Sequence, residues 1–547
     1  MWNRTKVYLS SRVASVICFI IAILGKIILL KVFLTIGADK MGQIAITRNF
    51  LQGHGLRLLA SSPTDISSSS YIWNNGWPPG YNLLLSLFLS PSGFNYVQAS
   101  FVTDCVAALL FFWYCRKVLL MIDFPIWTVN LFLLFQSFFL FKYLQRDPVT
   151  DFLSLSLMVA AMYYVLKVVK ECKVSINTIA WLSFFLLAAS SMRYQNFPAC
   201  LFLAGALTFI GWFQKQPSWS TTGCIAVCFL IFCFGGFLVY QHFQAGKAYY
   251  LVPVRNGFFP SNLLYMDPYV FTAFVNVHFL AVQASKANLA SYTTCAELVR
   301  WTAIPLGLLF TLVAGRHFIK TRFRIRHAQE GFFFFGFITY LSIVGLLVLL
   351  SLRLDINIGP PLFRWTYVMN ARYYAFPIFY VQVCLWWYLF VRPVKHGNLW
   401  LRWLKVLFLG LMTFEALHGA YFTIKHCNRD LFVFRDTEIE KPEQALLTQF
   451  VKESQARDPD RKIVVASYFS RIRFLADLYG VSTILDIRTL SHQMPLSSKP
   501  AVLLAVLSRS ELQMFEKFIH EPGVKLLSQT KDYYLYTYYV EPSGTKQ

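Results

Sequence analysis

Apolar runs of about twenty residues recur along most of the chain, with polar segments between them. A helix of that length matches the hydrocarbon core of a bilayer. We predict about eleven such spans, at residues 13–36, 96–115, 119–141, 150–168, 176–190, 196–213, 222–241, 301–318, 332–351, 373–391 and 402–424. The pattern therefore predicts an all-α polytopic membrane module over residues 1–427, with long loops at 37–95, 242–300 and 352–372.

From about residue 428 the apolar runs shorten and charges of both signs appear between them. Four runs are typical of strands, and three segments between them follow a helical pattern. The expected strands are 462–468, 482–487, 501–507 and 533–540, and the expected helices are 441–456, 469–479 and 509–519. Alternating strands and helices predict a small α/β domain over 428–547. The domain lacks a phosphate loop and a nucleophile elbow, so we expect it to order loops or bind an acceptor.

Composition agrees with a membrane protein, because 56% of the 547 residues are hydrophobic and only 14% are charged. The net charge of +23 does not indicate a nucleic-acid partner, because the cations collect in alternate loops. Such loops are cytoplasmic by the positive-inside rule. We therefore expect a cytoplasmic N-terminus and an extracytoplasmic C-terminus. The only N-x-Ser/Thr acceptor, at Asn3, falls on the cytoplasmic side, which favours a bacterial inner membrane.

Two charged residues stand out around the first span. Lys26 lies near its middle, where a lysine either extends to the membrane surface or faces the interior of a bundle. Asp39 follows the span and begins a predicted helix that ends at Gly53-His54-Gly55. Asp39 is open to two interpretations: an anion stabilised at the positive end of the helix dipole, or a catalytic carboxylate.

Aromatic residues gather in the stretch "YIWNNGWPPGYNLLLSLF" at 71–88, where Pro79 and Gly80 precede an apolar helix. Trp73, Trp77 and Tyr81 offer rings on which a sugar can stack, and we group His54 with them as candidate sugar- or acceptor-binding residues. An aromatic belt at the membrane interface is the alternative.

Two acids lie four residues apart in "KYLQRDPVTDF" at 142–152. Asp147 precedes Pro148 and is a plausible helix N-cap, which is its structural interpretation. The functional interpretation makes Asp147 and Asp151 carboxylates that complement Asp39 on the outer face.

Four arginines lie at predicted outer ends of spans, against the bias of the other cations: Arg193, Arg353, Arg364 and Arg372. An anionic partner would explain them, since guanidinium groups bind phosphate in a bidentate manner. Ion pairs with Asp147, Asp355 or lipid headgroups are the alternative.

Taken in order, these stretches resemble the C-type (GT-C) glycosyltransferases, in particular the protein mannosyltransferase and aminoarabinose transferase branch. The matching stretches span residues 10 to 392 and read "ADKMGQIAITRNFLQGHGL", "WPPGYNLLLSLF", "RDPVTD" and "NARYYAFPIF". The resemblance implies a polyprenyl-phosphate-linked sugar donor and a lipid, glycan or protein acceptor. The family has an Arg-Tyr pair before a late span, here Arg372-Tyr373, and we expect these residues, together with Arg193 or Arg353, to bind the donor phosphate.

The chain departs from the family directly after its first acid. Many relatives have a second acid there, whereas this chain has Lys40. Lys40 is then a candidate phosphate-binding residue, and a divalent metal ion stays an open question. The expected reaction is inverting, with Asp39 as general base. The rival hypothesis is a transporter or flippase of an anionic lipid-linked glycan, which would need polar groups at mid-membrane.

Overall fold

A computed structural model of the chain describes most of its residues and divides into two compact units. The membrane unit comprises Met1–Leu34, Asp104–Tyr240 and Tyr249–Leu431, and the sheet unit comprises Thr35–Thr103, Gln241–Ala248 and Phe432–Gln547. The described residues are 11–32, 34, 37–62, 64–74, 76–89, 94–139, 149–171, 174–246, 257–265, 269–273, 292–321, 323–353, 371–392, 399–425, 442–467, 473–474, 476–477, 480–484, 490, 494–509, 511–529 and 533–542.

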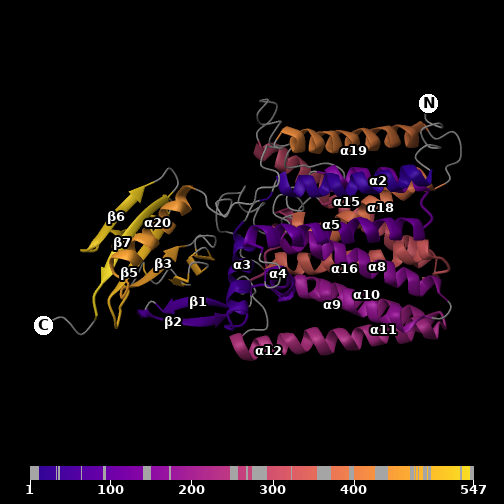
Figure 1. The fold of residues 1–547 in the computed structure, drawn as a ribbon. Helices are drawn as coiled ribbons and strands as arrows, with labels where there is room; N and C mark the ends of the chain where they lie inside the picture. The colour runs from indigo at the N-terminus through magenta and orange to yellow at the C-terminus, as the bar shows by residue number, and fades with distance from the viewer. Residues whose placement is uncertain are drawn as a thin grey trace. The chain divides into compact units, whose positions relative to one another are not determined.

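Helices of the membrane unit run side by side as a bundle (Figure 1). They are α2 (Arg12–Val32), α5 (Tyr96–Met121), α6 (Ile126–Phe138), α8 (Val149–Lys170), α9 (Ile176–Met192), α10 (Asn196–Phe213), α11 (Pro217–Leu230), α15 (Tyr292–Lys320), α16 (Ala328–Arg353), α18 (Ala375–Trp386) and α19 (Leu399–Lys425). Shorter elements are η1 (Ile231–Gly235), α12 (Gly236–Ala245), η2 (Pro260–Tyr265), α13 (Tyr269–Thr272), η3 (Ala371–Tyr374) and η4 (Trp387–Val391). Each predicted span overlaps a helix within the described residues, although α15, which contains the span predicted at 301–318, is not among the segments found long and apolar enough to cross a membrane.

Eight helical segments among the described residues are long and apolar enough to cross a membrane. They are Arg12–Val32, Tyr96–Met121, Thr150–Lys170, Asn196–Phe213, Pro217–Ala245, Ala328–Arg353, Arg372–Val391 and Arg402–Lys425. The predicted spans at 119–141 and 176–190 correspond to the shorter apolar helices α6 and α9. These helices confirm the predicted polytopic membrane architecture.

Helix α8 forms the interior of the bundle, because 83% of its span is buried, against 28% of Pro217–Ala245. An apolar helix that other helices surround is buried on all faces, whereas one at the rim exposes a stripe to lipid. The two ends of α8 differ in charge, since Asp151 lies in its first turn and Lys167 and Lys170 lie in its last.

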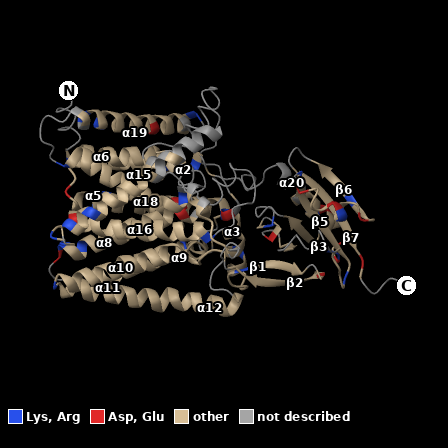
Figure 2. Cartoon of the chain, turned by 180° about the vertical axis from the view of Figure 1, so that it is seen from behind, with Lys and Arg blue, Asp and Glu red and all other residues tan. Residues whose placement is uncertain are grey.

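Basic residues collect at the end of the bundle where α5 and α8 finish (Figure 2). The Lys117 ammonium lies 5.2 Å from the centroid of the Tyr163 ring on α8, and Lys167 pairs with Glu171 at 3.5 Å. Asp151 therefore lies at the opposite end, roughly 30 Å away by the rise of a helix of this length.

The sheet unit contains one seven-stranded sheet in the order β2-β1-β4-β3-β5-β7-β6. The strands are β1 (Arg57–Ser62), β2 (Asp65–Trp73), β3 (Lys462–Ser467), β4 (Ser482–Ile484), β5 (Ala501–Ser508), β6 (Val524–Gln529) and β7 (Tyr533–Val540). Strands β1, β4, β3 and β5 are parallel, and β1-β2, β5-β7 and β7-β6 pair antiparallel.

The predicted α/β domain is confirmed, and the sheet also takes two strands from the first long loop. Helices α20 (Pro442–Arg457) and α22 (Glu516–Ile519) match the first and last predicted helices in part. Residues 473–474 and 476–477 are helical, and the other positions of the expected helix at 469–479 lie outside the described residues. The domain boundary at 427/428 stays a prediction.

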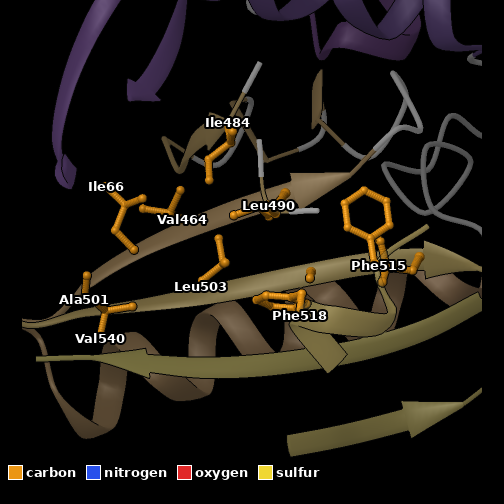
Figure 3. Packing of buried hydrophobic residues seen from close by; sticks show 12 residues of the cluster. Ile66, Val464, Ile484, Leu490, Ala501, Leu503, Phe515, Phe518 and Val540 are labelled. Carbon is orange, nitrogen blue, oxygen red and sulfur yellow. The ribbon is translucent and has the colours of Figure 1, made fainter. Parts of the chain in front are cut away.

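Alternation along the central strands gives the sheet two apolar faces. On one face, Ile66, Val464 and Leu503 pack with Phe515 and Phe518, as Figure 3 shows. On the other face, a second cluster packs against Val451 of α20: Ile463, Val465, Ala476, Val481, Val502, Leu504 and Val506. Both faces are covered, which is why β3 and β5 read as continuous apolar runs.

Buried Asp477 joins the first long loop to the C-terminal residues. Its carboxylate accepts hydrogen bonds from the Asn49 side chain at 3.0 Å and from the Leu59 backbone N–H at 3.1 Å. The Arg48 guanidinium donates to the Asp477 carbonyl oxygen at 2.8 Å. Burial raises the pKa of Asp477 to about 6, although these hydrogen bonds and the charge of Arg48 act in the opposite direction.

Asp65 makes a second connection of the same kind. Its carboxylate accepts hydrogen bonds from the backbone and hydroxyl of Ser67 and from the backbone and hydroxyl of Ser498. These hydrogen bonds lower the pKa of Asp65 to about 2. The start of β2 is thereby fixed to the segment that precedes β5.

Titration of Asp477 should lower the stability of the sheet unit as the pH rises. The native state binds this proton more tightly than the unfolded chain, so the stabilisation is complete below about pH 4 and is lost through about pH 6. Relative to Asp477→Asn, the unfolding free energy of the wild type should fall by on the order of 3 kcal/mol at most between pH 4 and pH 7.

Hydrogen exchange of β3 and β5, corrected for the intrinsic rate at each pH, measures this difference. Asp458→Asn, at an acid whose side chain is 49% exposed, is the matched control. An identical pH dependence in the wild type and in Asp477→Asn would refute the assignment.

Candidate functional site

Helix α3 (Ala38–Leu51) places Asp39 in its first turn, as predicted, with the side chain half-buried. After the helix, Gly53 and Gly55 have φ values of 85° and 74°, which L residues with a side chain rarely adopt. The glycines therefore end the helix, and the predicted stop is confirmed. Lys40 is fully buried.

Gln43 lies one turn after Asp39 and was missed by sequence reasoning. Residues four apart share a face of a helix. The Gln43 side chain is fully buried, and its amide has no hydrogen-bond partner among the described residues. Such an amide is costly unless a water or ligand satisfies it. In the sequence, only the position of a polar residue on the partly apolar face of this helix could have indicated Gln43.

Candidate sugar-binding residues in the sheet unit differ in exposure. Tyr81 is fully buried and its hydroxyl contacts that of Ser100 at 3.3 Å, which is a packing role. Trp73 and Trp77 are half-buried. The Trp77 ring meets Phe474 edge-on at 5.6 Å between centroids.

Gly42 permits this packing of Trp77. A Cβ added at Gly42 would lie 2.9 Å from ring atoms of both Trp77 and Phe474. The predicted site residue His54 is exposed and stacks on Tyr71, with centroids 3.8 Å apart. Trp73, Trp77 and His54 thus keep some accessible surface, and their binding roles stay predictions.

The outer arginine cluster, defined here as Asp151, Arg193, Arg372 and Tyr373, lies in the membrane unit. The Arg193 guanidinium pairs with the Asp151 carboxylate at 2.5 Å. The Arg193 and Arg372 guanidinium carbons lie 5.2 and 5.1 Å from the centroid of the Tyr373 ring. Arg372 also donates to the Tyr373 hydroxyl at 3.2 Å. Three elements, namely the start of α8, the end of α9 and η3, thus meet at one aromatic ring.

The corner between α9 and α10 holds Arg193 in place. The Asn196 amide donates to the carbonyl of Ala189 at 2.9 Å and to the hydroxyl of Ser154, which ties α10 to α9 and α8. Gln195 donates to the backbone carbonyl of Tyr373 at 3.2 Å. The polar side chains that follow Arg193 in the sequence therefore fix its surroundings.

Buried tyrosines support η3 from the other side. Tyr374 is fully buried and stacks on Tyr269 of α13, with an interplanar angle of 4° and centroids 5.0 Å apart. The Tyr269 hydroxyl contacts the Tyr340 hydroxyl of α16 at 2.5 Å. Packed hydroxyls and rings of this kind fix the backbone that carries Arg372 and Tyr373.

The charged groups that define the cluster are two guanidinium groups and one carboxylate. The Asp151 carboxylate, whose side chain is 1% exposed, pairs with the Arg193 guanidinium. Both guanidinium groups gain cation–π attraction from Tyr373. Guanidinium groups bind phosphate in a bidentate manner, so the cluster offers the chemistry of an anion-binding site.

The remaining predicted residues are not in this cluster. Arg353 is exposed at the last residue of α16. Asp147, Asp355 and Arg364 lie outside the described residues. The ion pair expected as the alternative for the outer arginines exists for Arg193, with Asp151 as its partner. Within the described part of the chain, no three His, Cys, Asp or Glu side chains gather as a metal site.

Comparisons with solved structures find ArnT from Cupriavidus metallidurans, in a crystal structure bound to undecaprenyl phosphate and in another in the apo state. Identity is 10% in both cases, and the alignments cover 96% and 95% of this chain and 98% and 97% of those chains. The TM-scores are 0.44 and 0.48. No protein-family profile and no curated protein matches the chain.

A double-mutant cycle should reveal strong coupling between Asp151 and Arg193. Asp151→Asn leaves a guanidinium that is only 13% exposed without its counter-ion, and Arg193→Gln leaves a buried carboxylate. Each single change should destabilise the bundle by about 3–5 kcal/mol. The double variant should be less destabilised than the sum by roughly 1–3 kcal/mol.

Unfolding of the detergent-solubilised protein measures this coupling. Lys167→Gln, which removes one side of the exposed pair with Glu171, is the matched control. Additive losses in the double variant would show that the pair does not organise the cluster.

Proposed function

We propose that the protein is an integral membrane glycosyltransferase that transfers a sugar from a polyprenyl-phosphate donor to an acceptor hydroxyl on the extracytoplasmic face. The observation that carries the proposal is the convergence of Arg193 and Arg372 on Tyr373. This cationic cluster lies at the end of the bundle opposite the basic end of α8. A phosphate-carrying lipid suits this cluster, because the lipid chain can lie among apolar helices while the phosphate reaches the cations.

Arg372 is the principal phosphate-binding residue of the proposal. Its planar fork supports two parallel hydrogen bonds to phosphate oxygens, which one ammonium cannot provide. Arg193 contributes less, because its charge is already engaged by Asp151. The Tyr373 hydroxyl, which accepts from Arg372, is oriented to donate to the same phosphate. The exposed Arg353 is a peripheral candidate.

Asp39 is the general base of the proposed reaction. It removes the proton from the acceptor hydroxyl while that oxygen forms a bond to the anomeric carbon. The bond from this carbon to the phosphate oxygen breaks, the phosphate leaves with the electron pair, and the configuration inverts. A positioned carboxylate contributes about 10²–10⁴-fold to such a step. Cations at the leaving phosphate stabilise the charge that develops there.

The other predicted residues have supporting roles. Asp151 positions Arg193 through the ion pair and does not itself contact the reacting atoms. Asp147 is kept as a candidate for orienting the acceptor or a divalent metal ion. Trp73 and Trp77 supply ring surface for a sugar, and Gln43 supplies an amide on the same face of α3 as Asp39.

Asp39→Asn should abolish transfer without weakening donor binding. An amide cannot take up the proton, so kcat should fall by about 100-fold or more while the donor KM stays constant. The assay uses nanodiscs, radiolabelled polyprenyl-phosphate sugars and a membrane extract that contains acceptors. Asp123→Asn is the matched control, because Asp123 is exposed and its φ of 62° is well tolerated by asparagine.

Three results can be distinguished in this assay. Loss of transfer in Asp39→Asn alone supports the proposed base. Equal transfer by both variants excludes Asp39 as the base. Movement of the labelled lipid across the bilayer with no transfer would instead favour the transporter hypothesis.

Arg372→Gln should raise the donor KM much more than it lowers kcat. Loss of a charge-assisted hydrogen bond costs about 1.5–3 kcal/mol, which corresponds to roughly 10- to 100-fold in affinity. Arg372→Lys should recover little of the donor affinity that Arg372→Gln loses, because a point charge does not replace the guanidinium fork. Arg392→Gln, at an exposed arginine after η4, is the control. An unchanged donor KM in Arg372→Gln would place the phosphate elsewhere.

A further inference from the structure

Lys26 is a buried cation within the membrane unit. It lies six residues before the end of α2 at Val32, and its side chain is only 4% exposed. A lysine that extends to the membrane surface keeps its ammonium in water or among headgroups. Lys26 instead faces the interior of the bundle, so the first of the two predicted orientations is wrong and the second is correct.

The Lys26 ammonium reaches the first turn of α8. Its nitrogen lies 5.1 Å from the centroid of the Phe152 ring, and Phe152 directly follows Asp151. Close packing of α2 holds it there, since a Cβ added at Gly25 would lie 2.7 Å from Phe138 of α6. Lys26 is therefore held next to the turn of α8 that carries the acid of the outer arginine cluster.

No carboxylate among the described residues lies within ion-pair distance of Lys26. Its ammonium lies over the face of Phe152, and Asp151 is engaged with Arg193. A cation–π contact offsets only part of the free energy that it costs to bury an ion. A charged residue placed inside a membrane bundle in this way is characteristic of a ligand site.

We infer that Lys26 binds a phosphate group, namely the phosphate of the lipid-linked donor. The inference rests on the proposed function and adds a residue to its phosphate site. A phosphate anion provides the negative charge that the surroundings of Lys26 lack. The apolar ring against its ammonium, that of Phe152, suits the hydrocarbon chain next to that phosphate.

A lysine fits this position better than an arginine would. Its ammonium is a compact point charge on a flexible stem, so it can follow one phosphate oxygen as the ester bond breaks. Arg372 fixes the orientation of the phosphate, and Lys26 supplies charge. Lys26 is thus a binding residue, and its loss should act on affinity before it acts on turnover.

Direct binding measurements on the full-length protein test the inference. Wild type, Lys26→Met, Lys26→Arg, Arg372→Gln and the control Lys117→Met are placed in phosphatidylcholine nanodiscs. Lys117 carries a cation at the basic end of the bundle. Each variant is titrated with undecaprenyl monophosphate and, separately, with inorganic phosphate. Unfolding without ligand is measured in parallel.

Lys26→Met should bind undecaprenyl monophosphate about 10-fold or more weakly than the wild type, while Lys117→Met should bind it normally. Without ligand, Lys26→Met should be as stable as the wild type or more so, because it removes an unpaired buried amine. Lys26→Arg, which keeps the charge, should retain binding within a few-fold. If inorganic phosphate shows the same dependence on Lys26, the phosphate group alone is recognised; if it does not, the lipid chain is required.

Normal binding of both probes by a folded Lys26→Met would overturn the inference. If Arg372→Gln weakens binding and Lys26→Met does not, the inference fails and the proposed phosphate site stands. If neither variant weakens binding, the phosphate site of the proposed function fails as well. Should Lys26→Met not fold, Lys26→Gln serves as the neutral variant in the same comparison.

Discussion

In an apolar bundle, a carboxylate that is almost wholly buried must be paired with a cation, and Asp151 is paired with Arg193. This ion pair connects the first turn of α8 to the corner between α9 and α10. Because Arg193 also packs on Tyr373, the pair determines where η3 can lie, and therefore where Arg372 lies. Hydrogen bonds from Gln195 and Asn196 strengthen the same corner. The candidate phosphate site thus depends on one charged contact in a low-dielectric environment.

Much of the membrane unit could be predicted from the sequence, because a run of twenty apolar residues permits few alternatives to a spanning helix. Arg193 and Arg372 were found because cations at the predicted outer ends of spans contradict the general charge bias, and Tyr373 was found through the resemblance to GT-C enzymes. Their shared contact with one ring could not be predicted, since it depends on how three helices pack. Asp151 was not among the acids expected to pair with the arginines, because the sequence does not show which acid an arginine meets in the folded bundle.

The sheet shows where pattern reasoning fails. Strands β3, β5 and β7 are long apolar or aromatic runs and were predicted within a residue or two. Strand β2 contains a run of serines and is an edge strand, so only Ile66 and a few other positions carry an apolar signal. Its partner β1 pairs in parallel with β4, and no local pattern reveals a contact between segments so far apart in the sequence.

The sheet contains strands from the first long loop and from the C-terminal residues, and this has a consequence for folding during synthesis. Leu59 and Asp477 are separated by 418 positions, so the first-loop hairpin leaves the ribosome long before its partners exist. At about 5–20 residues per second, the wait is roughly 20 to 80 s. During that interval β1 has an unpaired edge, which is a template for pairing with other chains. The short length of β1 and the serines of its neighbour β2 limit that hazard until synthesis is complete.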